Sequence, residues 1–155
     1  MATVDVSFTP LPAHVRTARL VALAMARRIG VAEDTLDEVR LAVGEACSRA
    51  VGVHAVRAPA TPVTMRLSDD DGCFTVEVTD AGMLEDDLET EIGALDASRL
   101  SAVVGPEGPL DALPPGFGLV VIGGLVEQVD VRCDESGTHV TMTWPAPGPI
   151  DLTRD

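Results

Sequence analysis

The sequence of 155 residues contains no lysine, and this absence limits what the protein can bind. Proteins that bind nucleic acid contact its phosphates through clustered lysine and arginine side chains. Here 11 arginines are opposed by 25 aspartates and glutamates, which leaves a formal net charge of −14 and a pI near 4.4. The composition excludes a general nucleic-acid binder. It favours a basic protein partner, or an acidic surface that serves only for solubility.

Cysteine is scarce, and the three that occur, Cys47, Cys73 and Cys133, are far apart. Their number and spacing fit neither a metal site nor a disulfide framework, so we expect small core residues in a reducing compartment. The chain also lacks an apolar leader. Its longest apolar stretch, residues 117–126, is too short to cross a bilayer. The sequence therefore predicts a cytoplasmic protein without a membrane span.

The hydrophobic content of 46% is enough for one domain with its own core. We expect that domain to cover residues 1–145, and the proline-rich residues 146–155 to form a C-terminal tail. Residues 81–115 show no clear periodicity, begin with acidic side chains and end in several glycines and prolines. A segment of this length inside a compact domain is usually a functional lid or a disordered insertion. We interpret it as a lid.

Hydrophobic spacing predicts eight elements. In chain order they are a strand over 4–8, a helix over 14–29, a helix from 34 or 35 that residues 57–62 break, strands over 63–67 and 74–79, a helix over 118–127, and strands over 129–133 and 139–144. The apolar face of the first helix is expected at Val15, Leu20, Leu23, Ala24 and Ile29. Strands linked in neighbouring pairs favour an α+β fold, a two-layer α/β sandwich with a mixed, mostly antiparallel sheet and helices on one face.

Three segments carry groups suited to a nucleotide. Asp80 ends a predicted strand, where its carboxylate can accept the exocyclic amine of adenine, and Gly82 leaves room for the base. Gly116 and Gly118 lie at the start of a predicted helix, where free N–H groups and the helix dipole attract phosphate. Glu45, on the second helix, can polarise a water or a substrate hydroxyl. The alternatives are that Asp80 caps a turn and that the two glycines are ordinary loop residues.

The order and spacing of these segments resemble the small anti-sigma-factor serine kinases of the GHKL ATPase superfamily. The matching motifs are Glu45-Ala46 on the second helix, Asp80-Ala81-Gly82 after a strand, Gly116-Phe117-Gly118-Leu119 before a helix, and Gly137-Thr138 at the start of the last strand. The resemblance extends over residues 30–145 and implies an ATP site with Glu45 as the catalytic base. Residues implied at the nucleotide are Arg49, Asp80, Gly82, Gly116, Gly118 and Thr138.

The sequence also departs from the family pattern at this site. Arg49 stands where the resemblance calls for an asparagine that holds Mg²⁺, and a guanidinium has no acceptor for a cation. Glu45 and Arg49 are four residues apart, so we expect an ion pair that occupies the base. Leu84 replaces the second glycine of the Asp-x-Gly-x-Gly motif, and residues 85–91 are acidic, which repels a triphosphate. His54 lies one residue beyond the family's helical histidine and is assigned no role.

These features lead to a prediction of function. The resemblance implies a bacterial anti-sigma-factor-like regulator that switches between a sigma factor and an anti-sigma-factor antagonist, either as a monomer or as a homodimer. It also implies a partner-facing surface around Arg16 and Arg19 on the first helix. The departures predict little or no ATP binding, no magnesium site and little or no kinase activity. Two alternatives stay open, namely an active kinase that phosphorylates the antagonist, and a ligand-sensing module that kept only the fold.

Overall fold

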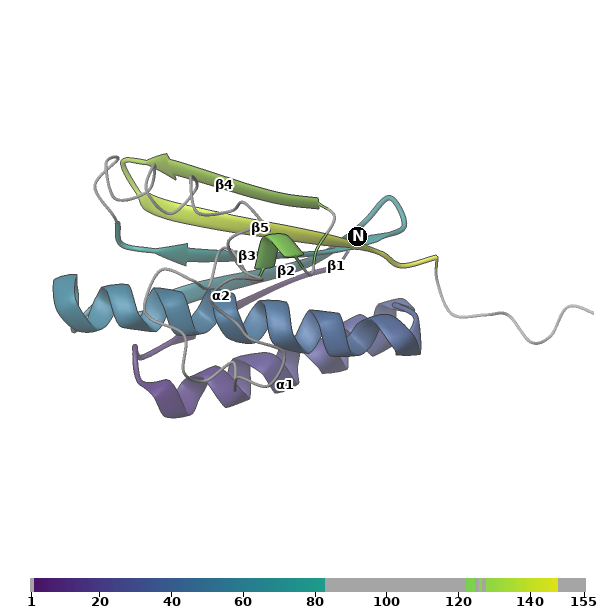
Figure 1. The fold of residues 1–155 in the computed structure, drawn as a ribbon, viewed down its shortest axis with the longest axis horizontal. Coiled ribbons are helices and arrows are strands. Elements are labelled where there is room, and N and C mark those ends of the chain that lie inside the picture. Colours follow the sequence, from purple (N-terminus) through teal and green to yellow (C-terminus); the bar gives the residue numbers. More distant parts are fainter. Residues whose placement is uncertain (1, 83–121, 125, 127, 148–155) are drawn as a thin grey trace, which may run out of the picture.

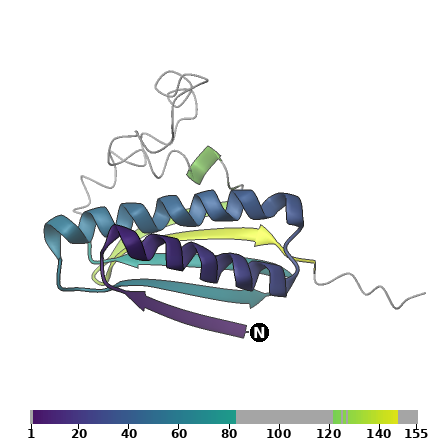
Figure 2. The same ribbon diagram turned by 90° about the horizontal axis from the view of Figure 1, so that it is seen from below.

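The computed structural model describes residues 2–82, 122–124, 126 and 128–147, and these residues form two layers (Figure 1). One layer is a five-stranded sheet, and the other consists of two long helices that lie side by side on one of its faces (Figure 2). The predicted α+β sandwich with helices on one face is therefore confirmed. Of the helix predicted over 118–127, residues 122–124 are helical, and the rest of it lies largely outside the described residues.

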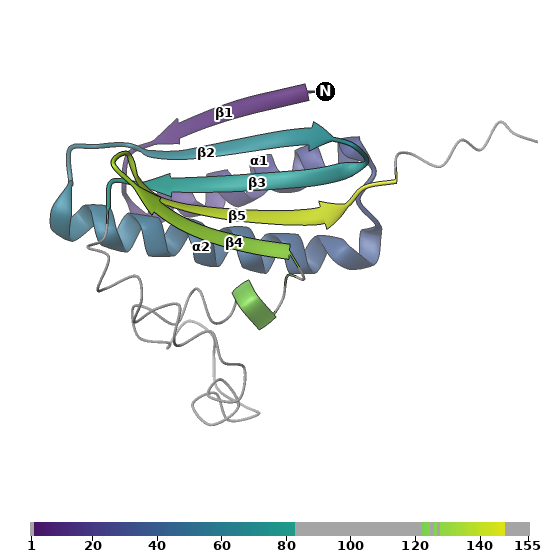
Figure 3. The same cartoon turned by 90° about the horizontal axis from the view of Figure 1, so that it is seen from above.

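The sheet is antiparallel throughout its described strands. These are β1 (Ala2–Phe8), β2 (Val63–Asp70), β3 (Cys73–Asp80), β4 (Gln128–Asp134) and β5 (Gly137–Pro145), and they lie in the order β1-β2-β3-β5-β4. The mostly antiparallel sheet is thus confirmed, whereas the parallel part of a mixed sheet is not found among these five strands. β3 is the central strand, and it pairs with β5 (Figure 3). Because the two strands are antiparallel, the carboxyl end of β3 adjoins the start of β5.

The turn between β2 and β3 follows from its sequence. Asp71 and Gly72 have φ angles of +49° and +73°, the conformation that a two-residue hairpin turn requires and that aspartate followed by glycine adopts readily. The turn sets the register, in which Asp70 pairs with Cys73. Because side chains alternate along a strand, this register directs Phe74, Val76 and Val78 towards the helices.

Helix α1 (Pro12–Ile29) begins two residues earlier than predicted, because proline is favoured at the first helical position. It ends as predicted at Gly30, whose φ angle of +101° suits glycine. Its buried face agrees with the prediction at Val15, and Leu23 and Ile29 pack partly buried against the core, but the rest of the face differs. The buried residues are small and recur every three or four positions: Val15, Ala18, Ala22 and Ala26.

Leu20 and Ala24, predicted on the apolar face, lie on the exposed side of α1. At 100° per residue they point away from the alanine face, and Leu20 is 58% exposed. The alanines are buried because they allow α1 to approach helix α2 (Leu36–Arg57) closely. At Gly44 of α2 a Cβ atom would lie 2.9 Å from the Cδ atom of Arg19, so the Arg19 side chain of α1 packs directly on the backbone of α2.

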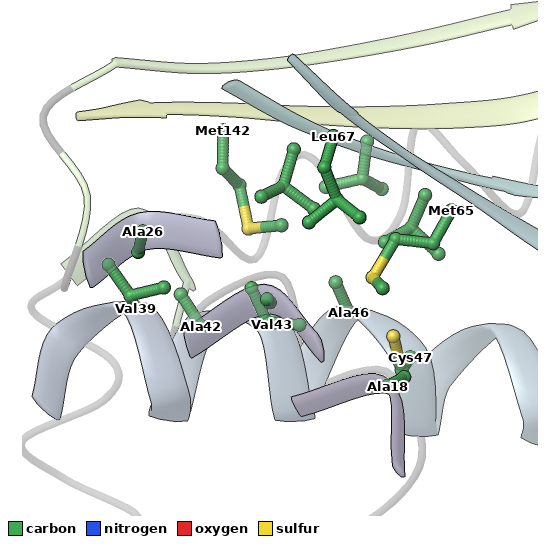
Figure 4. Packing of buried hydrophobic residues seen from close by; sticks show 14 of the residues in the cluster. Ala18, Ala26, Val39, Ala42, Val43, Ala46, Cys47, Met65, Leu67 and Met142 are labelled. Atoms are coloured by element: carbon green, nitrogen blue, oxygen red, sulfur yellow. The ribbon is translucent and has the colours of Figure 1, made fainter. Parts of the chain in front are cut away.

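The core lies between the helices and the sheet. Figure 4 shows Met65, Leu67 and Met142 of the sheet facing Val43 and Ala46 of α2. Trp144 is 2% exposed and stacks on Phe74 with 6.0 Å between ring centroids, so it belongs to the core. Cys47 is buried as predicted, but Cys73 and Cys133 are half-buried, since both lie near strand ends.

None of the helices in the described part of the chain is long and apolar enough to cross a membrane.

Candidate functional site

The site lies where the carboxyl end of β3 meets the C-terminal half of α2, and a buried ion pair forms its centre. The Arg49 guanidinium donates from Nη1 to Oδ2 of Asp80 over 2.6 Å. The side chains of Arg49 and Asp80 are only 4% and 1% exposed. Removing one member of such a pair leaves a buried charge without compensation, which typically costs about 3–5 kcal/mol. The pair is therefore a strong constraint on this corner of the fold.

The second carboxylate oxygen of Asp80 is also occupied. Its Oδ1 atom accepts the backbone N–H of Gly82 over 3.0 Å. Gly82 has a φ angle of +112°, a conformation that residues with a Cβ rarely adopt, and nothing lies within 4 Å of where its Cβ would be. The structure thus brings together Asp80, Gly82 and Arg49, three of the residues that the sequence predicted for the site. Within the chain itself, both oxygens of Asp80 have donors.

His54 of α2 holds the next residue of the segment. Its ring is 1% exposed, Nε2 accepts the backbone N–H of Ala81 over 2.7 Å, and Nδ1 donates to the carbonyl of Thr61 over 2.7 Å. Sequence reasoning assigned His54 no role. A signal was present, because His54 continues the spacing of Val43, Cys47 and Val51 on the buried face of α2, where a polar side chain needs buried partners.

Arg57, in the last turn of α2, donates from Nη1 to the carbonyl of Gly82 over 3.2 Å. Asp80, Ala81 and Gly82 are therefore each contacted by a different side chain of the same helix. We call the contacts of Arg49, His54 and Arg57 with residues 80–82 the α2 clasp. It connects the end of β3 to the helix layer through one ion pair and two hydrogen bonds to the backbone.

The start of β5 closes the site on the sheet side. Thr138 pairs with Asp80 in the β3–β5 register and is fully buried, and its hydroxyl donates to the Sγ atom of Cys133 over 3.9 Å. At Gly137 a Cβ atom would lie 1.7 Å from the carbonyl oxygen of Asp80, so no other residue fits there without displacing the backbone. The predicted neighbourhood of Thr138 and Asp80 is present in the structure.

The turn that precedes β5 is fixed by hydrogen bonds to Asp134. Its Oδ1 atom accepts the backbone N–H and the hydroxyl of Ser136, and it also lies 3.1 Å from Nε2 of His139. The Ser136 hydroxyl and the His139 ring hold the pKa of Asp134 well below its usual value. These contacts set the geometry from which Gly137 and Thr138 enter the sheet.

The remaining predicted residues are partly outside the described part of the chain. Gly116, Gly118 and Leu84 are outside it. Glu45 is half-buried on α2, one turn before Arg49. Arg49 contacts Asp80, and the predicted ion pair between Arg49 and Glu45 stays a prediction.

Arg49 cannot serve as a magnesium ligand among the described residues, because a guanidinium has no acceptor atom. The described residues contain no group of three or more histidine, cysteine, aspartate or glutamate side chains that could hold a metal. Arg49 occupies the helical position at which the resemblance calls for an amide ligand, and its cationic head lies against the one carboxylate of the cluster. A divalent cation beside this guanidinium would be repelled.

The chain matches known proteins over most of its length. The family described as histidine kinase-like ATPase domain matches residues 8–144. The serine-protein kinase RsbW of Bacillus cereus strain G9842 is 31% identical over 138 residues, which cover 84% of this chain and 76% of that protein. RsbW of Bacillus cereus strain AH820 is 28% identical over 133 residues with the same coverage.

Two solved structures share the fold. The structure of the RsbU and RsbW domains of Rv1364c from Mycobacterium tuberculosis superposes with a TM-score of 0.63 at 16% identity, and the match covers 94% of this chain but 32% of that one. The SiaB–SiaC complex from Pseudomonas aeruginosa gives a TM-score of 0.57 at 9% identity, with coverage of 90% and 86%. At these identities the likeness concerns the fold alone. By the extent of its match, the chain belongs to the histidine kinase-like ATPase domain family, as its resemblance to the GHKL anti-sigma-factor serine kinases predicted.

Proposed function

We propose that this protein is a cytoplasmic anti-sigma-factor-like regulator that acts by partner switching, with little or no kinase activity. It binds a sigma factor, an anti-sigma-factor antagonist, or each in turn. The names of its relatives support the regulatory class, since they are serine-protein kinases RsbW. The fold is also that of a chain solved together with a protein partner in the SiaB–SiaC complex.

The buried pair of Arg49 and Asp80 carries the proposal that catalysis is lost. An adenine base recognised through Asp80 needs a carboxylate oxygen for its exocyclic amine. Here the guanidinium supplies that donor from within the chain. An adenine that displaced the guanidinium from Asp80 would have to separate the pair, at a cost of about 3–5 kcal/mol, which would weaken binding by about two to four orders of magnitude.

The proposed metal defect acts in the same direction. Phosphoryl transfer normally needs a metal ion to bridge the phosphate oxygens and neutralise the developing charge. Arg49 cannot hold that ion, so no transfer step is assigned to this site. Glu45 would remain as a carboxylate without the activated substrate that a catalytic base requires.

Helix α1 is the surface we propose for the partner. It contains four arginines, Arg16, Arg19, Arg27 and Arg28, and no acidic residue, although the protein as a whole is strongly acidic. Leu20 is 58% exposed and Leu11, which precedes the helix, is 50% exposed. The acidic chain as a whole favours a basic partner, but this basic helix with its exposed leucines fits a segment of the partner that is acidic and partly apolar.

A phosphotransfer assay tests the proposal. The tagged protein is used to capture its partner from native lysate, and the captured antagonist is then incubated with the protein, labelled ATP and Mg²⁺. We expect a stable complex and no labelled antagonist. Label that appears with the wild-type protein and disappears in Glu45→Ala would instead establish an active kinase.

A further inference from the structure

We propose that His54 is a positioning residue of this site: its neutral ring fixes the backbone of Ala81 and thereby holds the Asp80 carboxylate in front of Arg49. The inference rests on the proposed function only in so far as both concern the same ion pair. Beyond the proposed function, it gives a role to His54, which lies one residue past the position of the family's helical histidine.

The two ring contacts determine the protonation state of His54. The carbonyl of Thr61 can only accept a hydrogen bond, so Nδ1 carries the proton. The backbone N–H of Ala81 can only donate, so Nε2 has none. A protonated ring would have no acceptor for Ala81. The neutral Nδ1–H tautomer is therefore the form that makes both contacts.

The position of the ring explains why this contact affects Asp80. His54 and Arg49 both belong to α2, and five residues of helix rotate the chain by about 500°, so their side chains leave the helix about 140° apart. They nevertheless reach adjacent residues of one segment, Asp80 and Ala81. Fixing Ala81 restricts the backbone that carries the Asp80 side chain, and the Gly82 N–H then meets Oδ1 of the same carboxylate.

The burial of the pair makes this restriction important. Arg49 and Asp80 lose most of their hydration, so their attraction must be realised at short range. A displacement of Asp80 by an ångström or more would lengthen the 2.6 Å contact while both charges stayed buried. A residue that holds the neighbouring backbone in place therefore contributes to the ion pair without touching either charge. Arg57 adds a third contact at Gly82, at the exposed end of the clasp.

Two substitutions separate the contacts of His54. In His54→Gln the side-chain amide oxygen reaches the region of Nε2 and can still accept from Ala81. In His54→Asn the shorter amide reaches the region of Nδ1 and can still donate to Thr61, but it does not reach Ala81. Both variants remove buried ring volume, so they serve as controls for each other. His14 is a half-buried histidine in the first turn of α1, and its ring contacts the carbonyl of Thr9. The variant His14→Asn therefore controls for the loss of a histidine ring elsewhere in the protein.

Hydrogen exchange of backbone amides, followed by NMR, is the first measurement. We expect the Ala81 amide of His54→Asn to exchange about tenfold or more faster than in the wild type, relative to Val78 in the preceding strand β3. We expect His54→Gln and His14→Asn to leave the ratio of the two exchange rates unchanged. Equal ratios in His54→Asn and His54→Gln would mean that His54 only fills space, and the proposal would be wrong.

The second measurement uses the wild-type protein alone, so it does not depend on a variant that folds. Long-range ¹H–¹⁵N spectra of the histidine ring show which nitrogen carries the proton. We expect protonated Nδ1 and unprotonated Nε2 for His54, and the opposite tautomer would overturn the proposal. Neither result depends on phosphotransfer, so an active kinase would refute the proposed function and leave the test of His54 intact.

Discussion

At the scale of single residues, two arginine–aspartate pairs of similar length differ in what surrounds them. Arg49 and Asp80 are 2.6 Å apart with side chains 4% and 1% exposed, whereas Arg66 and Asp5 are 2.7 Å apart with side chains 60% and 64% exposed. Water screens the exposed pair and solvates either partner when the other is removed. The buried pair has no such compensation.

We therefore expect Arg49→Ala to lower the free energy of unfolding by about 3–5 kcal/mol, because it leaves the Asp80 carboxylate buried without its counter-charge. Arg66→Ala should leave the free energy of unfolding nearly unchanged. Urea denaturation of the two variants and the wild type measures both effects. Equal effects of the two substitutions would show that Asp80 reaches water and that the site is open.

The three thiols differ in burial, and this gives a second prediction. Burial raises the pKa of the Cys47 thiol to about 12, although the nearby charge of Arg19 opposes the rise. Only the thiolate reacts with disulfide reagents, so we expect Cys47 to be the slowest of the three to label in the native protein at pH 8. Mass spectrometry after timed labelling assigns the rates. Cys47→Ala should remove the slow phase, and a fast Cys47 would indicate local opening of α2.

Single-residue contacts were the hardest feature to predict from the sequence. Asp80, Gly82 and Thr138 were recognisable because glycines and a strand-ending carboxylate leave a local pattern. The contact of Arg49 with Asp80 was not, because Asp80 is 31 residues away and meets Arg49 only after the sheet has packed on α2. His54 was missed for a similar reason, since both of its partners lie beyond the helix.

At the scale of secondary-structure elements, glycine has opposite roles in β5 and α2. Gly137 begins β5 with a φ angle of +126°, and a Cβ there would meet the Asp80 carbonyl oxygen. Gly52 lies on the exposed side of α2, and nothing is within 4 Å of where its Cβ would be. Glycine costs stability inside a helix because its unfolded backbone is more flexible than that of alanine.

We expect Gly137→Ala to lower the free energy of unfolding by more than about 3 kcal/mol, because the strand must shift away from Asp80. Gly52→Ala should raise it by about 0.5–1 kcal/mol. Thermal or urea unfolding compares the two single-methyl additions. A tolerated Gly137→Ala would mean that the β3–β5 pairing is looser at this end than the structure shows.

The element boundaries were largely predictable, whereas the orientation of α1 was not. Gly30 and the residues after Arg57 interrupt helical spacing in ways that the sequence displays directly. The buried face of α1 could not be read from hydrophobicity, because its alanines are selected by the close approach of α2 rather than by their size. Leu20 is larger and more apolar than Ala22, yet it is the exposed one.

The β4–β5 turn is expected to respond to acid. The hydrogen bonds from Ser136 and His139 lower the pKa of Asp134 in the folded protein, so they contribute stability above the unfolded pKa of about 4. This contribution is lost as the pH falls below that value towards the lowered pKa. We expect unfolding midpoints in urea between pH 5 and pH 3 to fall less steeply in Asp134→Ala than in the wild type. Asp130→Ala, an exposed position on the same strand, should keep the wild-type slope.

At the scale of the whole molecule, charge is distributed unevenly. Helix α1 contains four arginines and no acidic residue, so its formal charge is +4. The rest of the chain therefore has a formal charge of −18, which gives the total of −14. The face of the sheet away from the helices is polar, with Thr75, Glu77 and Thr79 on β3. Three of the four exposed large hydrophobic residues that the structure describes, Val4, Leu11 and Leu20, belong to or adjoin β1 and α1. Charge and apolar exposure therefore both support the partner surface proposed on α1.

Ligand binding adds to the stability of the whole molecule, so a thermal shift tests whether the site is closed. A ligand at a hundred times its dissociation constant adds about 2.7 kcal/mol, which is several degrees in melting temperature for a domain of this size. We expect no shift of the wild-type protein with millimolar Mg-ATP, because the Arg49–Asp80 pair already satisfies the carboxylate.

The sequence contains no asparagine, so no amide of that kind is available at any other position. Arg49→Asn frees Oδ2 of Asp80 and supplies a neutral acceptor one turn after Glu45, and we expect a shift of a few degrees to appear. Ser48→Asn, on the exposed neighbouring position, is the matched control and should give none. A wild-type shift as large as that of Arg49→Asn would show that the guanidinium moves aside for the nucleotide, and the site would then have to be regarded as a functional ATP site.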